Sequence, residues 1–486
     1  MVFVAERADN PPGSGGLWEE ADMNRAAFLG AVLAGLAWAG DGVASSDEAV
    51  PEQPPTVRRV AMTLTAEGQL FGPVTGAAEP ARQPIAMNGV FQFDEAVRPS
   101  AADAVAVRRY VRAEATIDAD DAEQRLTLAA DAREVSMARL GTTPLPYLAA
   151  AYLSRDELEL LETPFDSILL EDLLPGRAVA SDDHWPLAGD LAAGLLAIDT
   201  VETGTLEARI VEIVDGMARI TLAGAVDGAV DGVPTHVVVD GAFTVAAEPD
   251  EDGFILVGDV TRVDATVKEN RQASHVAAGF EIEATIAITR EPATDAPIDG
   301  ADAADDTPAR VVRRRGPGKP GSVWYRDAEG RYDLVHDSGW RVVEEDAGGV
   351  VLRLLDLGAL VAQCSITALP RSEDAAAPTV AEVKKHVEQS LSGQFRRFDA
   401  TNETTREDDG VRAVRVASEG SAEGLPFRWV HYVLTDGEGR RVNVAFMYEA
   451  SLEKRFADAD ARLVAGLGFL AEPHREARLP RKTDMP

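Results

Sequence analysis

The feature that most constrains this chain is a polar segment at residues 291–321, EPATDAPIDGADAADDTPARVVRRRGPGKPG. It has few apolar residues, many Pro and Gly residues, an acidic first half and a basic second half. No helical or strand period runs through it, and a segment of this composition cannot bury enough apolar surface to fold by itself. We therefore expect a disordered linker at 291–321, folded domains at 56–290 and 322–470, and a disordered tail at 471–486.

Residues 56–290 are dominated by alternation of apolar and polar residues, which is typical of half-buried β-strands. Val60, Met62 and Leu64 alternate in this way within RRVAMTLTAEG. A second strand is expected at 107–117, with the odd-numbered positions toward the core. Arg108 and Tyr110 would then face solvent.

Asp-Gly pairs punctuate the second half of this region, at 215–216, 227–228, 231–232, 240–241 and 252–253. Asp-Gly between two apolar runs is a strong hairpin signal, because both central residues of a tight hairpin turn need a positive φ. The region is therefore predicted to be an antiparallel meander.

A helical insert at 150–200 interrupts the strands. Ser154 and Glu157 have the spacing of a capping box before an apolar run, and further short helices are expected at 167–174 and 186–198. Strands, helices and strands again resemble the half-barrel of lipoprotein carriers. That resemblance implies a curved sheet closing around helices and a cavity for an apolar ligand; a plain β-rich scaffold is the alternative.

The region 322–470 carries a second resemblance. The stretch from Tyr332 to Trp340, YDLVHDSGW, is an aromatic strand that leads into a Gly-Trp turn. Strands follow, then a helix with a Thr379 and Glu382 capping box, a hairpin across 436–439 and one last helix from 452 to 470. This order resembles the PsbP fold and its bacterial relatives.

The PsbP resemblance implies an α+β sandwich and an accessory or binding role. Members of that family share no catalytic set, so no functional residue is carried over. The fold class expected for the whole chain is α+β, with a β-rich N-terminal domain and a PsbP-like C-terminal domain.

Residues 23–45, MNRAAFLGAVLAGLAWAGDGVAS, have the order of a secretory signal peptide. Arg25 supplies the positive charge, 26–39 the apolar run, and Ala37 and Ala39 an A-x-A cleavage site. The alternative is a buried core helix. Residues 1–22 are expected to be a disordered or non-native extension, with Met23 a possible true start, and 46–55 a linker. We expect an exported protein, periplasmic or extracellular, without a transmembrane segment in the mature chain.

The net charge is −35, which disfavours nucleic acid and anionic membrane surfaces as partners. The single cysteine, Cys364, lies in an apolar stretch and is predicted to be buried. The seven histidines have no metal-ligand spacing, so no metal or cofactor is predicted.

The one basic cluster is Arg313, Arg314 and Arg315 with Lys319. It is either a solvated charge run of the linker or a site for an anionic partner. The surrounding 316–321 matches G-x-G-x-x-G, but its two prolines remove N–H groups that a phosphate cradle needs.

Trp429 and His431 lie on one face of a predicted strand, where they would either line a pocket or pack in the core. Together with the basic cluster they are the candidate binding residues; no catalytic or metal-binding residue is predicted. The function expected is that of a non-catalytic binding or accessory protein of the cell envelope. Its partner would be an unidentified envelope protein or a small apolar ligand. The alternatives are a periplasmic carrier of an apolar ligand and an unrecognised hydrolase.

Overall fold

The computed structural model describes residues 56–71, 82–97, 105–119, 122–230, 232–250, 253–272, 279–293, 314–356, 359–422 and 424–470. The predicted extension, signal peptide, first linker and tail lie outside these residues, as does 294–313 of the predicted linker. The described residues form two compact units. The N-terminal unit runs to Val323 and includes Asp337–Val343 and Arg353–Leu360; the C-terminal unit contains Trp324–His336, Glu344–Leu352 and the chain from Val361 onward.

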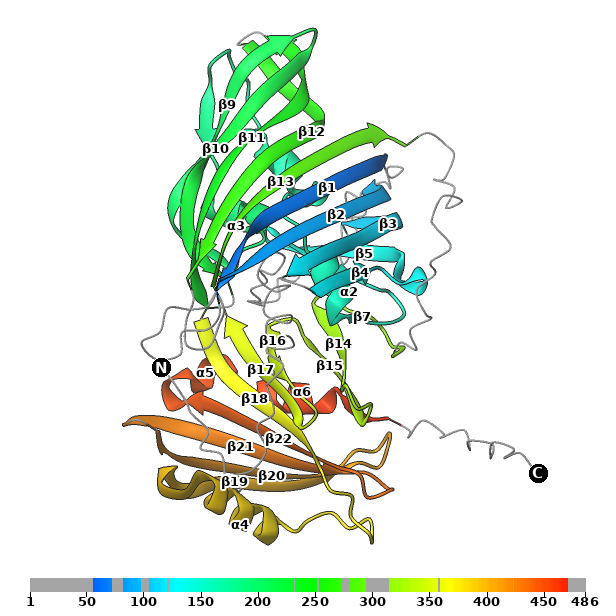
Figure 1. Ribbon diagram of the computed structural model, residues 1–486, viewed down its shortest axis with the longest axis vertical. Helices are drawn as coiled ribbons and strands as arrows, with labels where there is room; N and C mark the ends of the chain where they lie inside the picture. Colours follow the sequence, from blue (N-terminus) through cyan, green and yellow to red (C-terminus); the bar gives the residue numbers. More distant parts are fainter. Residues whose placement is uncertain are drawn as a thin grey trace, which may run out of the picture. The chain divides into compact units, whose positions relative to one another are not determined.

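The N-terminal unit is built on one large antiparallel sheet (Figure 1). The strands of this unit are β1 (Thr56–Phe71), β2 (Arg82–Val97), β3 (Ala106–Ala119), β4 (Ala122–Thr127), β5 (Glu134–Leu140), β6 (Thr143–Tyr147), β7 (Leu153–Ser154), β8 (His184–Pro186), β9 (Thr200–Val214), β10 (Met217–Val230), β11 (Val233–Asp250), β12 (Gly253–Arg271) and β13 (Gly279–Pro292). The strand order is β6-β5-β3-β2-β1-β13-β12-β11-β10-β9-β8, and β4 pairs with β3. The two end strands of this path do not pair with each other, so the sheet is open over the described residues.

The predicted meander is confirmed, although only some Asp-Gly pairs form turns. Asp215 and Gly216 have φ angles of 52° and 75° and join β9 to β10. The pairs at 231–232 and 252–253 lie at the connections between consecutive strands that pair with each other, but Asp231 and Asp252 lie outside the described residues. The pairs at 227–228 and 240–241 lie inside β10 and β11 instead. A side chain at Gly228 would collide with the carbonyl oxygen of Thr200, so glycine there permits the close approach of β9.

The expected facing of β3 is wrong over its first half. A bulge opposite Gln92 and Phe93 leaves Val111 as an extra residue, because Gln92 pairs with Arg112 but Phe93 pairs with Tyr110. An extra residue reverses which side chains point inward. Ala113, Ala115 and Ile117 are buried as predicted, whereas residues 106, 108 and 110 are buried in place of 107, 109 and 111.

The helical insert contains α2 (Arg155–Leu161), the 3-10 helix η2 (Ser167–Leu173) and α3 (Gly189–Leu196), preceded by the short η1 (Ala130–Ala132). The predicted capping box is present: Glu157 N–H donates to Ser154 Oγ, and the Glu157 carboxylate accepts from Ser154 N–H. The apolar side chains of the insert belong to the same core cluster as the inward side chains of β1, β2, β3 and β13. The insert therefore packs on the inner face of the sheet.

The C-terminal unit is an antiparallel sheet with helices on both faces. The elements from residue 322 onward are β14 (Ser322–Arg326), β15 (Tyr332–Asp337), β16 (Trp340–Glu345), β17 (Gly349–Asp356), β18 (Ala359–Leu369), α4 (Val380–Leu391), η4 (Ser392–Gln394), β19 (Phe395–Thr405), β20 (Arg412–Ala422), β21 (Leu425–Thr435), β22 (Arg441–Glu449), η5 (Ala450–Leu452), α5 (Glu453–Phe456), α6 (Ala459–Ala465) and β23 (Leu467–Phe469). Parts of β14 to β18 belong to the N-terminal unit by the division given above. The central order is β18-β22-β21-β20-β19. Val383 and Val387 of α4 pack against Val433 on one face, whereas Phe456 of α5 packs against Phe446 on the other.

Two expectations for this unit need correction. The single last helix is instead two short helices followed by a strand. Ala457 has a φ of 44°, which breaks the helix between α5 and α6, and Leu467 pairs with Leu334 of β15 as part of β23. Strand β19 was not predicted, because eight of its eleven residues are polar or charged and nine are exposed, so no apolar alternation marks it.

In the part of the chain that the structure describes, no helix is both long and apolar enough to cross a membrane. Cys364 is buried as predicted, and burial raises the pKa of its thiol well above the usual value.

Candidate ligand-binding site

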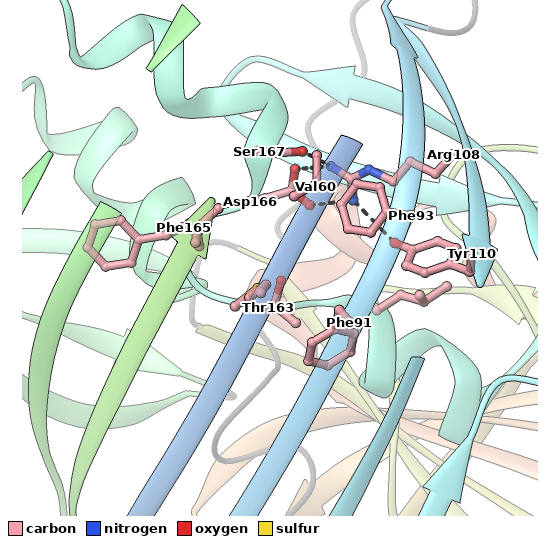
Figure 2. A pocket seen from close by; sticks show the side chains of 12 residues that line it. Val60, Phe91, Phe93, Arg108, Tyr110, Thr163, Phe165, Asp166 and Ser167 are labelled. Atoms are coloured by element: carbon pink, nitrogen blue, oxygen red, sulfur yellow. Dashed lines mark hydrogen bonds and ion pairs between the residues drawn. The ribbon is translucent and has the colours of Figure 1, made fainter. Parts of the chain in front are cut away.

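A narrow pocket lies between the sheet and the helical insert of the N-terminal unit (Figure 2). Four strands and the segment that joins α2 to η2 supply its walls. The apolar lining is Val60, Met62, Phe91, Phe93, Leu161, Phe165 and Ile288, and the polar lining is Arg108, Tyr110, Thr163, Asp166 and Ser167. Its volume is about 10 Å³, room for about one water molecule. A larger ligand can enter only if the insert moves.

A buried charged cluster forms one wall of the pocket. The guanidinium of Arg108 donates to Glu95 at 2.8 Å, to Ser167 at 2.9 Å and to both carboxylate oxygens of Asp166 at 2.9 and 2.5 Å. Figure 2 shows Arg108 pointing from the sheet toward Asp166 and Ser167 of the insert. Ser167 Oγ also donates to Glu95 at 2.6 Å. The cluster thus ties the insert to β2 and β3 by ionic hydrogen bonds.

The charges of this cluster are out of contact with solvent. Arg108 and Asp166 each expose 2% of their side chains, and Glu95 exposes none. Burial alone would lower the pKa of Arg108, but Asp166, Tyr110 and Glu95 outweigh burial and hold that pKa well above its usual value. Burial also raises the pKa of Tyr110 to about 12. Arg108 therefore stays a cation, and it faces two carboxyl groups.

The segment from Leu161 to Ser167 contains one strained residue and borders two small pockets. Phe165 has a φ of 57°, a left-handed conformation that is costly for a bulky side chain, and it is fully buried. A second pocket of about 20 Å³ lies beside the same segment, lined by Leu161, Thr163 and Asp166 together with Pro144 and Pro146 of β6. Both small pockets therefore border the segment that contains the strained residue.

The predicted candidate residues lie elsewhere. Arg313 is outside the described residues. Arg315 and Lys319 are exposed and Arg314 is half-buried. All three belong to the N-terminal unit. The backbone of Arg315 forms an isolated antiparallel β-bridge with Ala151. The structure does not bring them to the pocket.

Trp429 and His431 share one face of β21 in the C-terminal unit, and both are buried. Trp429 packs with Phe427 in an apolar cluster, with ring centroids 5.9 Å apart. Burial, with a smaller effect of His386, lowers the pKa of His431 to about 4. Among the described residues nothing accepts or donates a hydrogen bond at its Nδ1. Both side chains therefore sit in the core, the alternative that sequence analysis also carried.

The residues that do line the pocket were missed for a definable reason. Arg108 and Tyr110 were assigned to the solvent face of β3 because strict alternation places them there. Only the bulge at Val111 turns them inward, and no Gly or Pro marks that bulge in the sequence. The sequence did offer one signal. Arg108 and Tyr110 have long side chains that can reach aromatic residues, and the preceding strand carries Phe91 and Phe93.

No known protein family matches the chain, and no curated protein matches it. Among solved structures, the chain is similar to the solution structure of cyanobacterial PsbP from Synechocystis, with 14% identity and a TM-score of 0.26 over 31% of this chain and 92% of that chain. It is also similar to a protein of Bacteroides thetaiotaomicron, with 11% identity and a TM-score of 0.23 over 31% of this chain and 48% of that chain. A third is Pseudomonas aeruginosa OccK2 (OpdF) in complex with glucuronate, with 9% identity and a TM-score of 0.12 over 82% and 98% of the two chains.

Proposed function

We propose that this chain is a non-catalytic binding protein and that its N-terminal unit takes up an apolar ligand between the sheet and the helical insert. The ligand would replace insert side chains against the apolar wall formed by Val60, Met62, Phe91 and Ile288. The observation that carries the proposal is the Arg108 cluster, a buried ionic attachment between the sheet and the insert that is surrounded by apolar side chains.

The energetics of that attachment favour a movable insert. Replacing a buried ion pair by apolar residues is often neutral or stabilising, so stability alone does not explain charges at this position. Ionic hydrogen bonds are directional, and they fix one closed position of the insert. When the insert opens, water can form hydrogen bonds with the exposed charged groups in place of their protein partners, whereas exposed apolar side chains gain no comparable interaction with water. An interface built this way can open without leaving its polar groups unpaired.

The strained segment supports the same proposal. Strain at non-glycine residues with positive φ is concentrated at ligand clamps and switch regions. Phe165 lies between α2 and η2 and lines the first pocket, and its neighbours Thr163 and Asp166 line both pockets. Movement of this segment would release the left-handed backbone and join the two pockets beside it.

We also propose that the protein acts outside the cytoplasm, after export directed by 23–45, and that the C-terminal unit is a PsbP-like accessory domain. The support for export is the order of charge, apolar run and A-x-A site in the sequence. The support for the C-terminal domain is its element order, a sheet with α4 on one face and α5 and α6 on the other.

Titration of the full-length protein with the neutral apolar fluorophore N-phenyl-1-naphthylamine tests the binding proposal. The emission of the fluorophore should rise in a saturable manner. The variant Val60→Phe, which fills the pocket, should weaken binding roughly tenfold or more. Val57→Phe is the matched control, because Val57 lies on the same strand with 39% of its surface exposed. Equal binding by both variants, or no saturable binding, would contradict the proposal.

A further inference from the structure

A second pair of buried cations lies on the inner face of the same sheet. Arg58 of β1 and Arg290 of β13 expose 8% and 3% of their surfaces. The register places Val60 directly opposite Arg290 and Arg58 opposite Pro292, so the two arginines are diagonal neighbours. Buried guanidinium groups are stable only with anionic or hydrogen-bonding partners.

The partners present leave one edge of Arg290 unused. Its Nη1 donates to Glu171 at 2.7 Å and to the carbonyl of Val260 at 3.1 Å. Its Nε and Nη2 are buried and have no hydrogen-bond partner among the described residues, and neither does Nε of Arg58. Nε and one terminal nitrogen form the side-on fork with which arginine binds a carboxylate or phosphate through two parallel hydrogen bonds.

This fork is close to the apolar pocket. Val60 and Ile288 line the pocket, Val60 pairs with Arg290, and Ile288 precedes Arg290 by two positions on the same face of β13. Two residues along a strand span about 7 Å. A ligand whose apolar part lies against Val60 and Ile288 therefore has its end within reach of Arg290.

The anion that now holds the two arginines comes from the insert. Glu171 belongs to η2, and its Oε1 contacts Arg290 at 2.7 Å and Arg58 at 3.5 Å. Arg58 is also paired with Asp259 of β12 at 2.5 Å. If the insert moves away from the sheet, Glu171 leaves with it, while Asp259 remains. Two cations would then share one fixed carboxylate.

We propose that the ligand is an amphiphile with an acidic oxygen head group, a carboxylate or a phosphate, which binds the side-on fork of Arg290 and supplies the negative charge that Glu171 supplies in the closed protein. This inference rests on the proposed function, because it names the class of ligand that the same site accepts. Arg58 supplies the second positive charge. In the closed protein Glu171 neutralises the same two arginines from the Nη1 side of Arg290. The apolar chain of the ligand replaces the insert against the sheet.

Displacement of N-phenyl-1-naphthylamine from the full-length protein tests this inference with three ligands of one chain length: dodecanoate, dodecyl phosphate and neutral dodecanol. At least one acidic ligand should bind roughly tenfold or more tightly than dodecanol, the range expected for hydrogen bonds to a charged group. Arg290→Gln should abolish that preference, measured as the ratio of acidic-ligand affinity to dodecanol affinity of the same variant. Arg262→Gln, at an exposed arginine of β12, should change neither.

Glu171→Gln gives a result of opposite sign, because it removes the carboxylate charge that competes with the ligand's acid. It should increase the ratio of acidic-ligand affinity to dodecanol affinity. If Arg290→Gln does not fold, the affinities of the wild-type protein for the acidic ligands and for dodecanol still test the inference. Equal affinity for acidic and neutral ligands overturns the inference and leaves the proposed function intact. Failure of all three ligands and of the fluorophore overturns the proposed function. Displacement by acetate or phosphate without a chain, at the same concentrations, would overturn the requirement for an amphiphile.

Discussion

Arg108 and Asp166 are 58 positions apart in the chain, yet two parallel hydrogen bonds of 2.9 and 2.5 Å join their side chains. One residue belongs to the sheet and the other to the helical insert. A paired guanidinium and carboxylate fix both distance and orientation. This pair therefore sets the closed position of the insert, and its neighbours determine what happens when either member is replaced.

Arg108→Met should destabilise the protein more than Asp166→Asn. Removing the arginine leaves Glu95 and Asp166 buried with no cation, whereas removing the aspartate charge leaves Arg108 paired with Glu95. Breaking a buried pair in the first way costs about 3–5 kcal/mol. Urea unfolding of both variants at neutral pH measures the difference. Arg109→Met, on the same strand with 67% of its side chain exposed, should change stability by less than about 1 kcal/mol. If Asp166→Asn destabilised the protein more than Arg108→Met does, the explanation from unpaired buried carboxylates would be wrong.

Hydrogen exchange should show that the insert opens before the sheet. The backbone amides of α2 and η2 depend on the Arg108 cluster and on a strained connection, whereas those of β10 and β11 are paired along whole strands. In Arg108→Met we expect exchange of residues 155–173 to rise roughly tenfold or more, while that of 217–250 changes little. Equal acceleration of both regions would mean that the insert does not move separately.

The buried His431 should make stability depend on pH. Burial lowers its pKa to about 4 in the folded protein, whereas an unfolded histidine titrates near 6.5. The unfolded chain therefore binds the proton first, and stability is lost as the pH falls from about 6.5 toward 4. The loss amounts to about 2 kcal/mol between pH 7 and pH 5.

His431→Phe removes this dependence. The difference in unfolding free energy between the variant and the wild type is measured by urea unfolding at pH 7 and at pH 5. It should shift in favour of the variant by about 2 kcal/mol at the lower pH. The wild type serves as reference because the titration of its carboxyl groups is common to both proteins. His184→Phe, at an exposed histidine, is the control. A constant difference between wild type and His431→Phe at all pH values would show that His431 is not buried in its neutral form.

Cys364 should be inert in the folded protein. Its pKa is raised well above the usual value by burial alone, so the reactive thiolate is scarce and access is blocked. Ellman's reagent should react with one thiol per chain only after denaturation. Rapid reaction of the native protein would contradict the packing of β18.

Much of the fold follows from local patterns. Alternating residues mark β1, and the capping boxes at Ser154 and Thr379 correctly begin α2 and α4. These signals are local because a strand period or a cap involves residues a few positions apart. The antiparallel sheets of the two units are likewise expected from Asp-Gly turns such as Asp215-Gly216.

The site could not be derived in this way. Arg108 is turned inward by one extra residue in β3, and bulges depend on cross-strand pairing that the sequence of a single strand does not show. Its partners Glu95 and Asp166 are 13 and 58 positions away. Arg290 and Glu171 meet across 119 positions. Periodicity identifies which elements form, but convergence of distant polar side chains requires the three-dimensional arrangement.

The most direct test of the central claim is to locate a bound apolar molecule on the full-length protein. A neutral long-chain alcohol that carries a diazirine is bound, photoactivated and mapped by peptide mass spectrometry. The account predicts labelling of peptides from β1, β2, β13 and residues 155–173, suppressed by Val60→Phe and unaffected by Val57→Phe. Labelling confined to the C-terminal unit, or labelling of the N-terminal unit that Val60→Phe leaves unchanged, would contradict it.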